Sequence, residues 1–386
     1  MAERTVPSRA SVVVIGGGVM GVSTAFHLAE AGVQDVVLVE RDALGSGSTS
    51  KAAGGVRAQF SDRLNIQLGL RSLEAFERFR ERPGQDIDLQ QVGYLFLLDT
   101  PEAVEAFEQS VHLQNELGVP SRIISAEEAK RLSPLVDTEG LLAAAFSPTD
   151  GHCTPESVVL GYATGARRLG ARVLAGCAAL GIETDGDSIR AVQTQAGRIE
   201  TETVVCAAGA WSKEVGSWAG VDLPVTPLRR QIVVTEPMAD LPQHLPMTLD
   251  FSTSFYFHRE GAGLLVGMSD PDEEPGFKLQ RSDSGLPRLS AAIERRAPRL
   301  LEVGLTSGWA GLYEMTPDHN ALIGEATSCS RFLYATGFSG HGFLMGPAVG
   351  EVLRDLYLGR TPFVDVSPLD AGRFSTAARR PELHII

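Results

Sequence analysis

A glycine-rich turn between an apolar strand and a helical segment is the strongest constraint on the fold of this chain. The unit begins with an apolar, β-branched run at 11–15 and continues through a G-x-G-x-x-G turn into a periodic segment that reaches about residue 31. A second apolar run at 36–39 ends in Glu40. Strand, glycines, helix, strand and terminal acid in this order predict the first unit of a parallel, helix-covered sheet.

The glycines and the terminal acid suit a dinucleotide. Gly16 permits the tight turn, Gly18 lets backbone N–H groups approach a pyrophosphate, and Gly21 lets the helix pack on the strand. The N-terminus of the helix directs partial positive charge at the phosphates. Glu40 lies 19 residues after Gly21, where an acidic side chain accepts hydrogen bonds from a ribose. The unit predicts dinucleotide binding without specifying which dinucleotide.

Charge and cysteine content bear on the partners and the cellular setting of the protein. The 386 residues contain 48 Asp and Glu against 34 Lys and Arg, a formal charge of −14, so we expect no nucleic-acid partner. The four cysteines are far apart and form no C-x-x-C pair, which predicts a reducing, cytoplasmic setting. No metal site is predicted. The chain is long enough for about two domains.

An uncharged run at 11–29 has the hydropathy of a possible membrane span. It contains four glycines and His27, and it changes from a β-branched stretch to a helical one. A spanning helix would not divide in this way, so we expect no membrane span. No small-residue cleavage site follows, so we expect no signal peptide either.

Three further segments carry a family resemblance. Residues 45–60 form a small-residue loop, 203–212 an apolar run entering a turn, and 332–343 an apolar run entering a glycine-rich turn before a helix at about 344–358. With the opening unit, they resemble the D-amino acid oxidase family of FAD enzymes, and within it the sarcosine oxidase and glycine oxidase branch. The motifs at 309–325 and 337–343 are especially similar to the sarcosine oxidase β subunit, dimethylglycine dehydrogenase and the proline dehydrogenase β subunit.

The resemblance implies an extended FAD and assigns its contacts. Besides the glycine turn, the cofactor residues are Val19 and Met20 at the helix start, Glu40 and Arg41 at the ribose and adenine side, Thr49, Ser50, Lys51, Gly54 and Gly55 around the pyrophosphate and flavin, Val173 at adenine, Gly209 and Trp211 closing the cleft, and Gly340, His341, Gly342 and Phe343 edging the isoalloxazine. The helix starting near 344 would aim its positive end at the pyrimidine end of the flavin, where charge grows on reduction.

The expected fold class is α/β, with a Rossmann-type, glutathione-reductase-like FAD domain and a mixed, largely antiparallel substrate domain. The predicted boundaries are 1–90, 150–222 and 318–372 for a discontinuous FAD domain, 91–149 and 223–317 for the substrate domain, and 373–386 for a C-terminal tail. The expected elements are helices at 101–118, 125–132, 154–169 and 286–299, a hairpin turning at 185–186, and strands at 231–235, 254–258 and 263–266.

Oxidation of an amino acid by flavin needs a cation or hydroxyl donors for the carboxylate, which points to basic and phenolic side chains. Arg57, at the end of the 45–60 loop, is expected at the cofactor or at the substrate carboxylate. Tyr256 and His258 share one face of a strand, and either a substrate role or simple packing is open. Tyr313 stands where the glycine oxidase pattern has its carboxylate-binding arginine, and by resemblance His341 contacts flavin or substrate.

Several positions depart from the patterns that the chain resembles. Gly311 replaces the cysteine that links FAD in monomeric sarcosine oxidase, so noncovalent FAD is expected. Ala53, Phe60, Leu265 and Leu344 replace that enzyme's catalytic histidine, second arginine, oxygen-activating lysine and carboxylate-binding lysine. Sarcosine itself is therefore a doubtful substrate.

Two further positions bear on the cofactor and the substrate. Pro155 replaces the FMN-linking histidine of the heterotetrameric β subunit, which argues against a second flavin. Arg230 or Arg259 is an alternative cation for the carboxylate. The histidines at 27, 112, 152, 244 and 384 have no neighbours in sequence that suggest a site.

These features together predict an FAD-dependent oxidase. It would oxidise the C–N bond of a glycine-type or N-substituted amino acid, such as an N-carboxymethyl amine, by hydride transfer to flavin N5, with hydrolysis of the imine and reoxidation by O2 to H2O2. The alternatives are a dehydrogenase subunit that passes electrons to a partner protein and, from another class, an assembly subunit with a structural flavin. A homo- or hetero-oligomer is possible.

Overall fold

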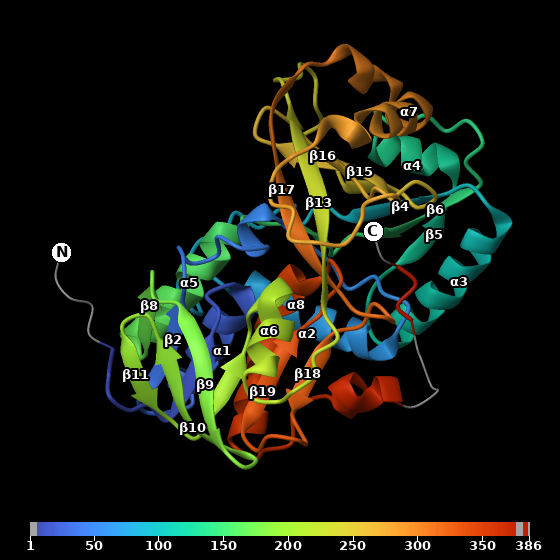
Figure 1. Cartoon of the computed structure of the whole chain (residues 1–386). Helices are drawn as coiled ribbons and strands as arrows, with labels where there is room; N and C mark the ends of the chain where they lie inside the picture. Colours follow the sequence, from blue (N-terminus) through green and yellow to red (C-terminus); the bar gives the residue numbers. More distant parts are fainter. Residues whose placement is uncertain (1–5, 376–380, 385–386) are drawn as a thin grey trace.

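Two large β-sheets organise the chain, and Figure 1 shows them one above the other. The structure is a computed structural model, and it describes residues 6–375 and 381–384. A six-stranded sheet runs in the order β18 (Leu322–Glu325), β19 (Phe332–Thr336), β12 (Val204–Cys206), β1 (Val12–Ile15), β2 (Val36–Glu40) and β8 (Arg172–Ala175). All neighbours are parallel except β18, which is antiparallel to β19.

The apolar strands of this sheet are buried on both faces. Val12 and Val14 point into one hydrophobic cluster, and Val13 and Ile15 point into another. Helices cover the first face: α1 (Val19–Glu30), α2 (Arg63–Glu77), α5 (Pro155–Arg168) and α8 (Gly342–Tyr357). A three-stranded antiparallel sheet packs on the second: β9 (Ala179–Asp185), β10 (Ser188–Thr194) and β11 (Gly197–Glu200). Burial on both faces explains why the strands are continuously apolar.

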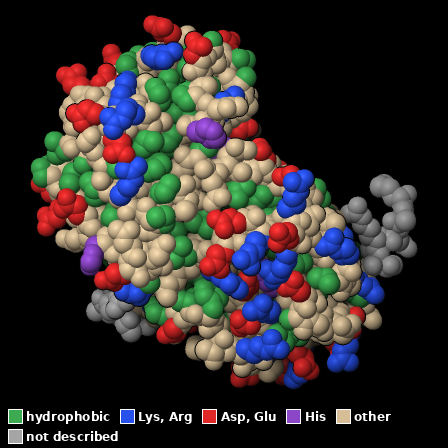
Figure 2. All heavy atoms as spheres, turned by 180° about the vertical axis from the view of Figure 1, so that it is seen from behind, with side chains coloured by type: hydrophobic (Ala, Val, Ile, Leu, Met, Phe, Trp, Pro, Cys, Tyr) green, Lys and Arg blue, Asp and Glu red, His purple; other side chains and the backbone are tan. Residues whose placement is uncertain are grey.

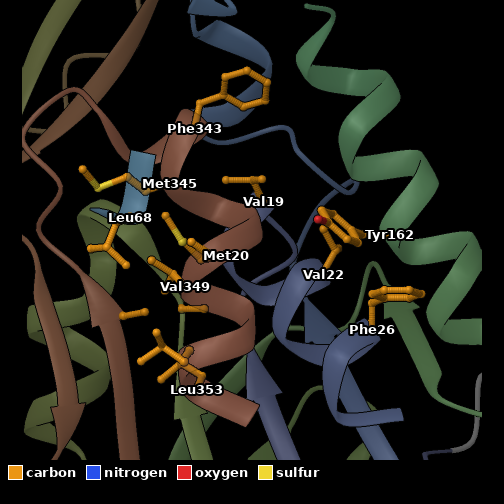
Figure 3. Close-up of a cluster of buried hydrophobic side chains, with 14 of the residues drawn as sticks. Val19, Met20, Val22, Phe26, Leu68, Tyr162, Phe343, Met345, Val349 and Leu353 are labelled. Carbon is orange, nitrogen blue, oxygen red and sulfur yellow. The ribbon is translucent and has the colours of Figure 1, made fainter. Parts of the chain in front are cut away.

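Helix α1 lies at the centre of the first face. Figure 3 shows Val19 and Met20 of α1 beside Met345 and Val349 of α8, with Tyr162 of α5 on the other side. The uncharged run at 11–29 is therefore a strand, a turn and a buried helix, as the sequence predicts. None of the helices in the described residues is long and apolar enough to cross a membrane.

The second layer is an eight-stranded sheet. Its order is β17 (Leu305–Met315), β13 (Thr226–Thr235), β16 (Gly263–Met268), β15 (Phe255–Glu260), β14 (Met247–Asp250), β4 (Tyr94–Leu98), β6 (Ala143–Ser147) and β5 (Arg122–Ile124). Only β14 and β4 pair in parallel. Three helices belong to this layer: α3 (Pro101–Glu116), α4 (Ala126–Leu132) and α7 (Leu286–Arg296). The fold is α/β with a Rossmann-type sheet and a mixed, largely antiparallel second sheet, as expected.

Smaller elements connect the layers. They are the short pair β3 (Gly55–Val56) and β7 (Gly151–His152), helix α6 (Ser212–Ser217), and the 3-10 turns η1 (Thr49–Lys51) and η2 (Gly209–Trp211). The face in Figure 2 shows basic and acidic side chains interspersed over the lower part of the molecule. Charges of both signs are therefore mixed on this part of the face.

Several expected elements have different ends in the structure. The helix predicted at 286–299 ends at Arg296 and continues as a 3-10 turn, and the helix expected near 344 begins at Gly342. The strand predicted at 231–235 begins at Thr226, because β13 pairs along its length with β17. Ser125 caps helix α4, since its Oγ accepts a hydrogen bond from Glu128 N at 3.2 Å, but the Glu128 carboxylate forms an ion pair with Arg122 rather than completing the capping box.

Candidate functional site

A cavity of about 540 Å³ lies where the carboxyl ends of the parallel strands meet the eight-stranded sheet. Ligands of open α/β sheets bind at this end of the strands. Most of the residues singled out in the sequence line it: Gly16, Gly18, Val19, Met20, Glu40, Arg41, Thr49, Lys51, Gly54, Gly55, Arg57, Gly209, Trp211, Tyr256, Tyr313, Gly340, His341, Gly342 and Phe343. Segments from distant parts of the chain therefore form one site.

The glycine turn is built for close backbone approach. Gly16 has φ +114°, and a Cβ on it would lie 2.2 Å from the carbonyl oxygen of Ala207. A Cβ on Gly21 would lie 1.9 Å from the carbonyl oxygen of Gly16. A side chain at Gly16 would push the turn away from the segment after β12, and one at Gly21 would push helix α1 away from the turn. Gly21 supports the turn from behind and is not part of the cavity wall.

The N-termini of two helices face the cavity. Helix α1 begins at Val19, whose N–H donates to Thr49 Oγ1 at 3.1 Å. Helix α8 begins at Gly342, and Gly342 and Phe343 line the cavity from the other side. Unpaired N–H groups at such ends favour negative charge. The site is therefore suited to an anionic ligand at two separate points.

Glu40 is held at the edge of the glycine turn. Its carboxylate accepts hydrogen bonds from Gly17 N at 2.7 Å and from Asp42 N at 2.8 Å. Next to it, the guanidinium of Arg41 lies 4.0 Å above the ring of Trp211, and Phe277 stacks on the same ring at 5.2 Å. Along this wall of the cavity, the Glu40 carboxylate is therefore followed by a stack of planar groups.

His341 precedes α8 and is 3% exposed. Its Nε2 is buried and has no hydrogen-bond partner among the described residues, although it lines the cavity. Burial lowers the pKa of His341 to about 3, so the ring is neutral at pH 7. A buried polar atom without a partner is costly, which indicates that a ligand completes its hydrogen bonding.

Strands β13 and β17 carry a cation and a phenol on one face. Arg230 pairs with Gly311, and Tyr313 lies two residues further along β17. The Arg230 guanidinium carbon is 5.3 Å from the Tyr313 ring centroid, and its Nε is buried without a partner. Within the described residues no carboxylate forms an ion pair with Arg230. Its charge is available to a ligand.

Two more tyrosines meet at the same end of the cavity, each against a glycine. A Cβ on Gly267 would lie 2.3 Å from the Tyr256 hydroxyl, and one on Gly55 would lie 2.2 Å from the Tyr94 hydroxyl. Burial raises the pKa of both phenols, so they remain protonated donors at neutral pH. Because glycine has no side chain, Gly267 and Gly55 leave room for the rings of Tyr256 and Tyr94.

Arg57 closes this end. It is 3% exposed, its guanidinium carbon is 4.1 Å from the Phe60 ring centroid, and Nη2 donates to the carbonyl oxygen of His384 at 2.6 Å. Nη1 donates to the carbonyl oxygen of Gln59. Burial lowers its pKa from the ordinary value, and Tyr94 and Glu382 act in the opposite direction. Arginine remains charged under such conditions, so this end of the cavity has two cations, Arg57 and Arg230.

Besides Gly21, three candidates lie outside the cavity lining. His258 shares the face of Tyr256, but its Nδ1 and Nε2 lie 2.8 and 2.9 Å from the carbonyl oxygens of Arg259 and Ala53. Burial lowers its pKa, and a neutral ring donates to only one of these carbonyls. His258 thus contacts backbone, and a substrate role for it stays a prediction. Ser50 and Val173 are also outside, so their cofactor contacts stay predictions.

Comparison with known proteins identifies the family. Residues 11–356 match the family model described as FAD dependent oxidoreductase, DAO. The chain belongs to this family. It is 32% identical to dimethylglycine dehydrogenase of Rattus norvegicus over 95% of the chain and 45% of that protein, and 32% identical to human sarcosine dehydrogenase over 96% of the chain and 42% of that protein. The chain thus spans less than half the length of these curated relatives.

Solved structures give a similar picture for this DAO-family chain. L-proline dehydrogenase from P. horikoshii superposes with a TM-score of 0.91 at 34% identity, covering 97% of this chain and all of that one. Glycine oxidase from Geobacillus kaustophilus gives 0.85 at 26% identity, covering 95% and 99%. The chain is thus a member of a family of FAD-dependent oxidoreductases, and it superposes on structures named L-proline dehydrogenase and glycine oxidase.

The described residues fit the FAD of the DAO family. The cradle at Gly16 and Gly18 would take the pyrophosphate, Glu40 the adenosine ribose, and the start of α8 the flavin end, where the partnerless Nε2 of His341 lies. A Cβ on Gly311 would lie 2.6 Å from Lys51 Cβ, so the position replacing the FAD-linking cysteine tolerates no larger side chain without movement. The donor set and the two helix ends suit a dinucleotide.

Two residues of the site were missed by sequence reasoning. Tyr94 opens an apolar strand and has no local signal beyond its hydroxyl. Glu314 lines the cavity and accepts hydrogen bonds from Thr336 Oγ1 at 2.8 Å and Gly337 N at 3.0 Å. Burial raises the pKa of Glu314. Its position directly after Tyr313 was the available signal.

Proposed function

We propose that this chain oxidises the C–N bond of a glycine-type or N-substituted amino acid with noncovalent FAD. A primary or secondary amine loses a hydride from carbon and a proton from nitrogen to give an imine, whereas a tertiary amine loses the hydride alone to give an iminium ion. Water then releases an amine and a carbonyl compound, such as glyoxylate from an N-carboxymethyl amine. Bound FAD would supply the two-electron acceptor. The names of the relatives, which print dimethylglycine, sarcosine, proline and glycine, support this substrate class.

The observation that carries the proposal is Arg230. Its guanidinium faces the cavity beside a tyrosine, and its Nε is buried without a partner. A carboxylate placed there would satisfy the charge and form short, charge-assisted hydrogen bonds. Tyr313 can donate one more bond, which answers the loss of an arginine at its own position. Arg259 plays no such part, because it lies outside the cavity and donates to Gly261 and Pro242 carbonyls.

The other residues at this end orient the substrate and exclude water. Tyr256 and Tyr94 present buried hydroxyls, and Met247 and Leu344 add apolar surface to the cavity wall. Since burial raises the pKa of the phenols, they stay neutral and donate rather than repel the carboxylate. Arg57 provides the second cation. An apolar wall next to the cations leaves the substrate amine neutral, which hydride loss requires.

Oxygen is the electron acceptor in the leading proposal. The second candidate is a dehydrogenase that passes electrons to a partner protein, and it is favoured by the printed names of dimethylglycine and sarcosine dehydrogenases at 32% identity. The printed name of 4-methylaminobutanoate oxidase of Paenarthrobacter nicotinovorans, 28% identical over 96% of the chain and 46% of that protein, favours oxygen. These activities belong to the relatives.

The test is an anaerobic titration of the flavin-loaded chain, followed by absorbance. Glycine, sarcosine, dimethylglycine, proline and N-carboxymethyl amines are added in turn, and air is then admitted. Bleaching by one of them supports the proposal, and rapid return of the oxidised spectrum supports the oxidase. Slow return in air with fast reaction toward an artificial dye supports the dehydrogenase. A flavin that dithionite reduces but no amine bleaches contradicts the proposed substrate class.

Two broader expectations remain proposals. We propose the division into an FAD domain at 1–90, 150–222 and 318–372 and a substrate domain at 91–149 and 223–317. The six-stranded sheet takes all of its strands from the first set of ranges. We also propose a reducing, cytoplasmic setting, which agrees with four buried cysteines that form no disulfide.

A further inference from the structure

We propose that the segment 381–384 is a positioning element for Arg57, and that substrate affinity depends on its docking. The segment lies far along the chain from the loop that carries Arg57, yet it ends against the guanidinium on the side away from the cavity. The inference rests on the proposed function insofar as Arg57 faces the substrate carboxylate. It concerns Glu382 and His384, which no sequence motif singled out.

Glu382 fastens the segment to the start of helix α2. One carboxylate oxygen accepts hydrogen bonds from Ser61 N at 2.9 Å and Ser61 Oγ at 2.7 Å, and the other accepts from Asn65 Nδ2 at 2.8 Å and Asp62 N at 3.2 Å. Glu382 is 2% exposed. Burial acts to raise its pKa, but His384 and these donors outweigh burial and lower it. A carboxylate at a helix N-terminus with several donors is strongly held.

His384 fastens the same segment to helix α3. Its ring stacks on Phe107 with centroids 4.0 Å apart and an interplanar angle of 8°, and its Nε2 lies 3.3 Å from Ser110 Oγ. The ring is 1% exposed, and its backbone N–H donates to Glu382 Oε1 at 3.0 Å. The segment is therefore held by α2 in one layer and by α3 in the other. These two contacts set the direction of its backbone.

The two anchors, Glu382 and the His384 ring, place the carbonyl group of His384 against Arg57. It accepts the Nη2–H bond at 2.6 Å, while the carbonyl of Gln59 accepts from Nη1. Two of the five guanidinium N–H groups are thus directed away from the cavity. A free arginine side chain has many rotamers, so an arginine without these acceptors would populate other orientations. Binding a carboxylate would then require the side chain to be ordered first.

A matched set of variants separates positioning from general stability. Glu382→Gln keeps the size of the side chain but turns an NH2 group toward donors. Leu383→Ala is the control, because the Leu383 side chain is 57% exposed between the two anchors and lines no part of the cavity. Arg57→Met removes the positioned group, and the Arg57→Met/Glu382→Gln double variant completes a cycle.

The experiment titrates each flavin-loaded variant with acetate and propionate and follows the flavin absorbance, together with thermal unfolding. We expect Glu382→Gln to weaken carboxylate binding about tenfold and Leu383→Ala to change it less than twofold. Arg57→Met weakens binding at least as much as Glu382→Gln, and the double variant is no weaker than Arg57→Met. Wild-type affinity in Glu382→Gln overturns the inference. So does an equal further loss in the Arg57→Met background.

A separate readout covers the case in which the unchanged chain binds no carboxylate. That result contradicts the proposed substrate class, and the midpoint potential of the bound flavin then decides the inference, because a displaced guanidinium changes the charge at the cavity. Glu382→Gln and Arg57→Met must shift the potential in the same direction, and the double variant must shift it no further than Arg57→Met. Unchanged potentials, or additive shifts, overturn the inference.

Discussion

The ring of Tyr313 lies against the backbone of Gly340, so closely that a Cβ on Gly340 would come within 2.4 Å of it. Gly340 belongs to the turn before α8, and Tyr313 belongs to strand β17 of the other sheet. The contact joins the turn that we propose for the flavin end of the cavity to the strand that we propose for binding the substrate carboxylate. It also explains why a tyrosine and a glycine-rich turn, 27 residues apart in the sequence, act as one unit.

Replacement of Gly340 by alanine should displace Tyr313. The new methyl would overlap the ring, and φ at Gly340 is +107°, which disfavours any side chain. We expect the variant to lose about 2 kcal/mol or more of unfolding free energy and most of its amine-dependent flavin reduction. Thermal unfolding and anaerobic titration measure the two effects.

Gly359→Ala is the matched control for this prediction. Gly359 has φ +65°, but nothing lies within 4 Å of where its Cβ would be. It should therefore lose only about 1 kcal/mol and keep its flavin chemistry. Equal losses in both variants would show that backbone conformation, and not the Tyr313 contact, accounts for the effect.

Arg230→Met should weaken carboxylate binding while leaving the cofactor in place. Loss of a charge-assisted hydrogen bond costs about 1.5 to 3 kcal/mol, which corresponds to about a tenfold to hundredfold higher dissociation constant. Titration of the loaded variant with acetate, and KM for the amine that bleaches the flavin, measure this. Arg259→Met serves as the control, since Arg259 is on β15, two strands away in the same sheet, and does not line the cavity. A larger effect in the control would refute the assignment.

Glu40→Ala should weaken the binding of FAD. The carboxylate holds Gly17 N at 2.7 Å and faces the place expected for the ribose, so its loss should raise the FAD dissociation constant about tenfold to hundredfold. Fluorescence titration of the apoprotein with FAD gives the value directly. Glu74→Ala, which removes an exposed acid that pairs with Arg71 on α2, should bind FAD as the unchanged chain does. Unaltered binding in Glu40→Ala would remove this residue from the cofactor site.

Stability should fall as pH decreases below 6.5. Burial lowers the pKa of His27, His152 and His341 to about 3 and that of His384 to about 4. The unfolded chain then binds protons between pH 6.5 and these values that the folded chain does not, so each histidine removes about 2 kcal/mol by pH 5. Asp150, whose pKa burial raises to about 6, acts in the opposite direction but binds only one proton.

Chemical denaturation across pH 5 to 7.5 tests this dependence. His27→Gln should flatten the curve, because His27 is fully buried on α1. His112→Gln should leave the curve unchanged, since that ring is 79% exposed. A stability that is constant over this range would contradict the assignment of neutral, buried histidines.

Much of the cofactor half of the site follows from local sequence. The strand, the glycine turn, the helix and Glu40 are consecutive, so short-range sterics and hydrogen bonding are enough to predict them. The turn at 337–343 and the loop at 45–60 are similar cases. Strand β17 and helix α2 were not predicted from the sequence. Strand β17 has a mixed pattern with two glycines, and only its pairing with β13 accounts for this strand.

The sequence by itself determined the fold class and dinucleotide binding, since these depend on residues that are neighbours along the chain, and the resemblance carried by several such motifs pointed to FAD and the family. Tertiary structure decided that Tyr256 and Tyr94 face the cavity while His258 contacts backbone, and that Arg230 rather than Arg259 carries the available charge. It also brought His384 to Arg57, 327 residues away. Sheet register and packing across layers set these relationships, and periodicity cannot specify which face of a strand meets a cavity.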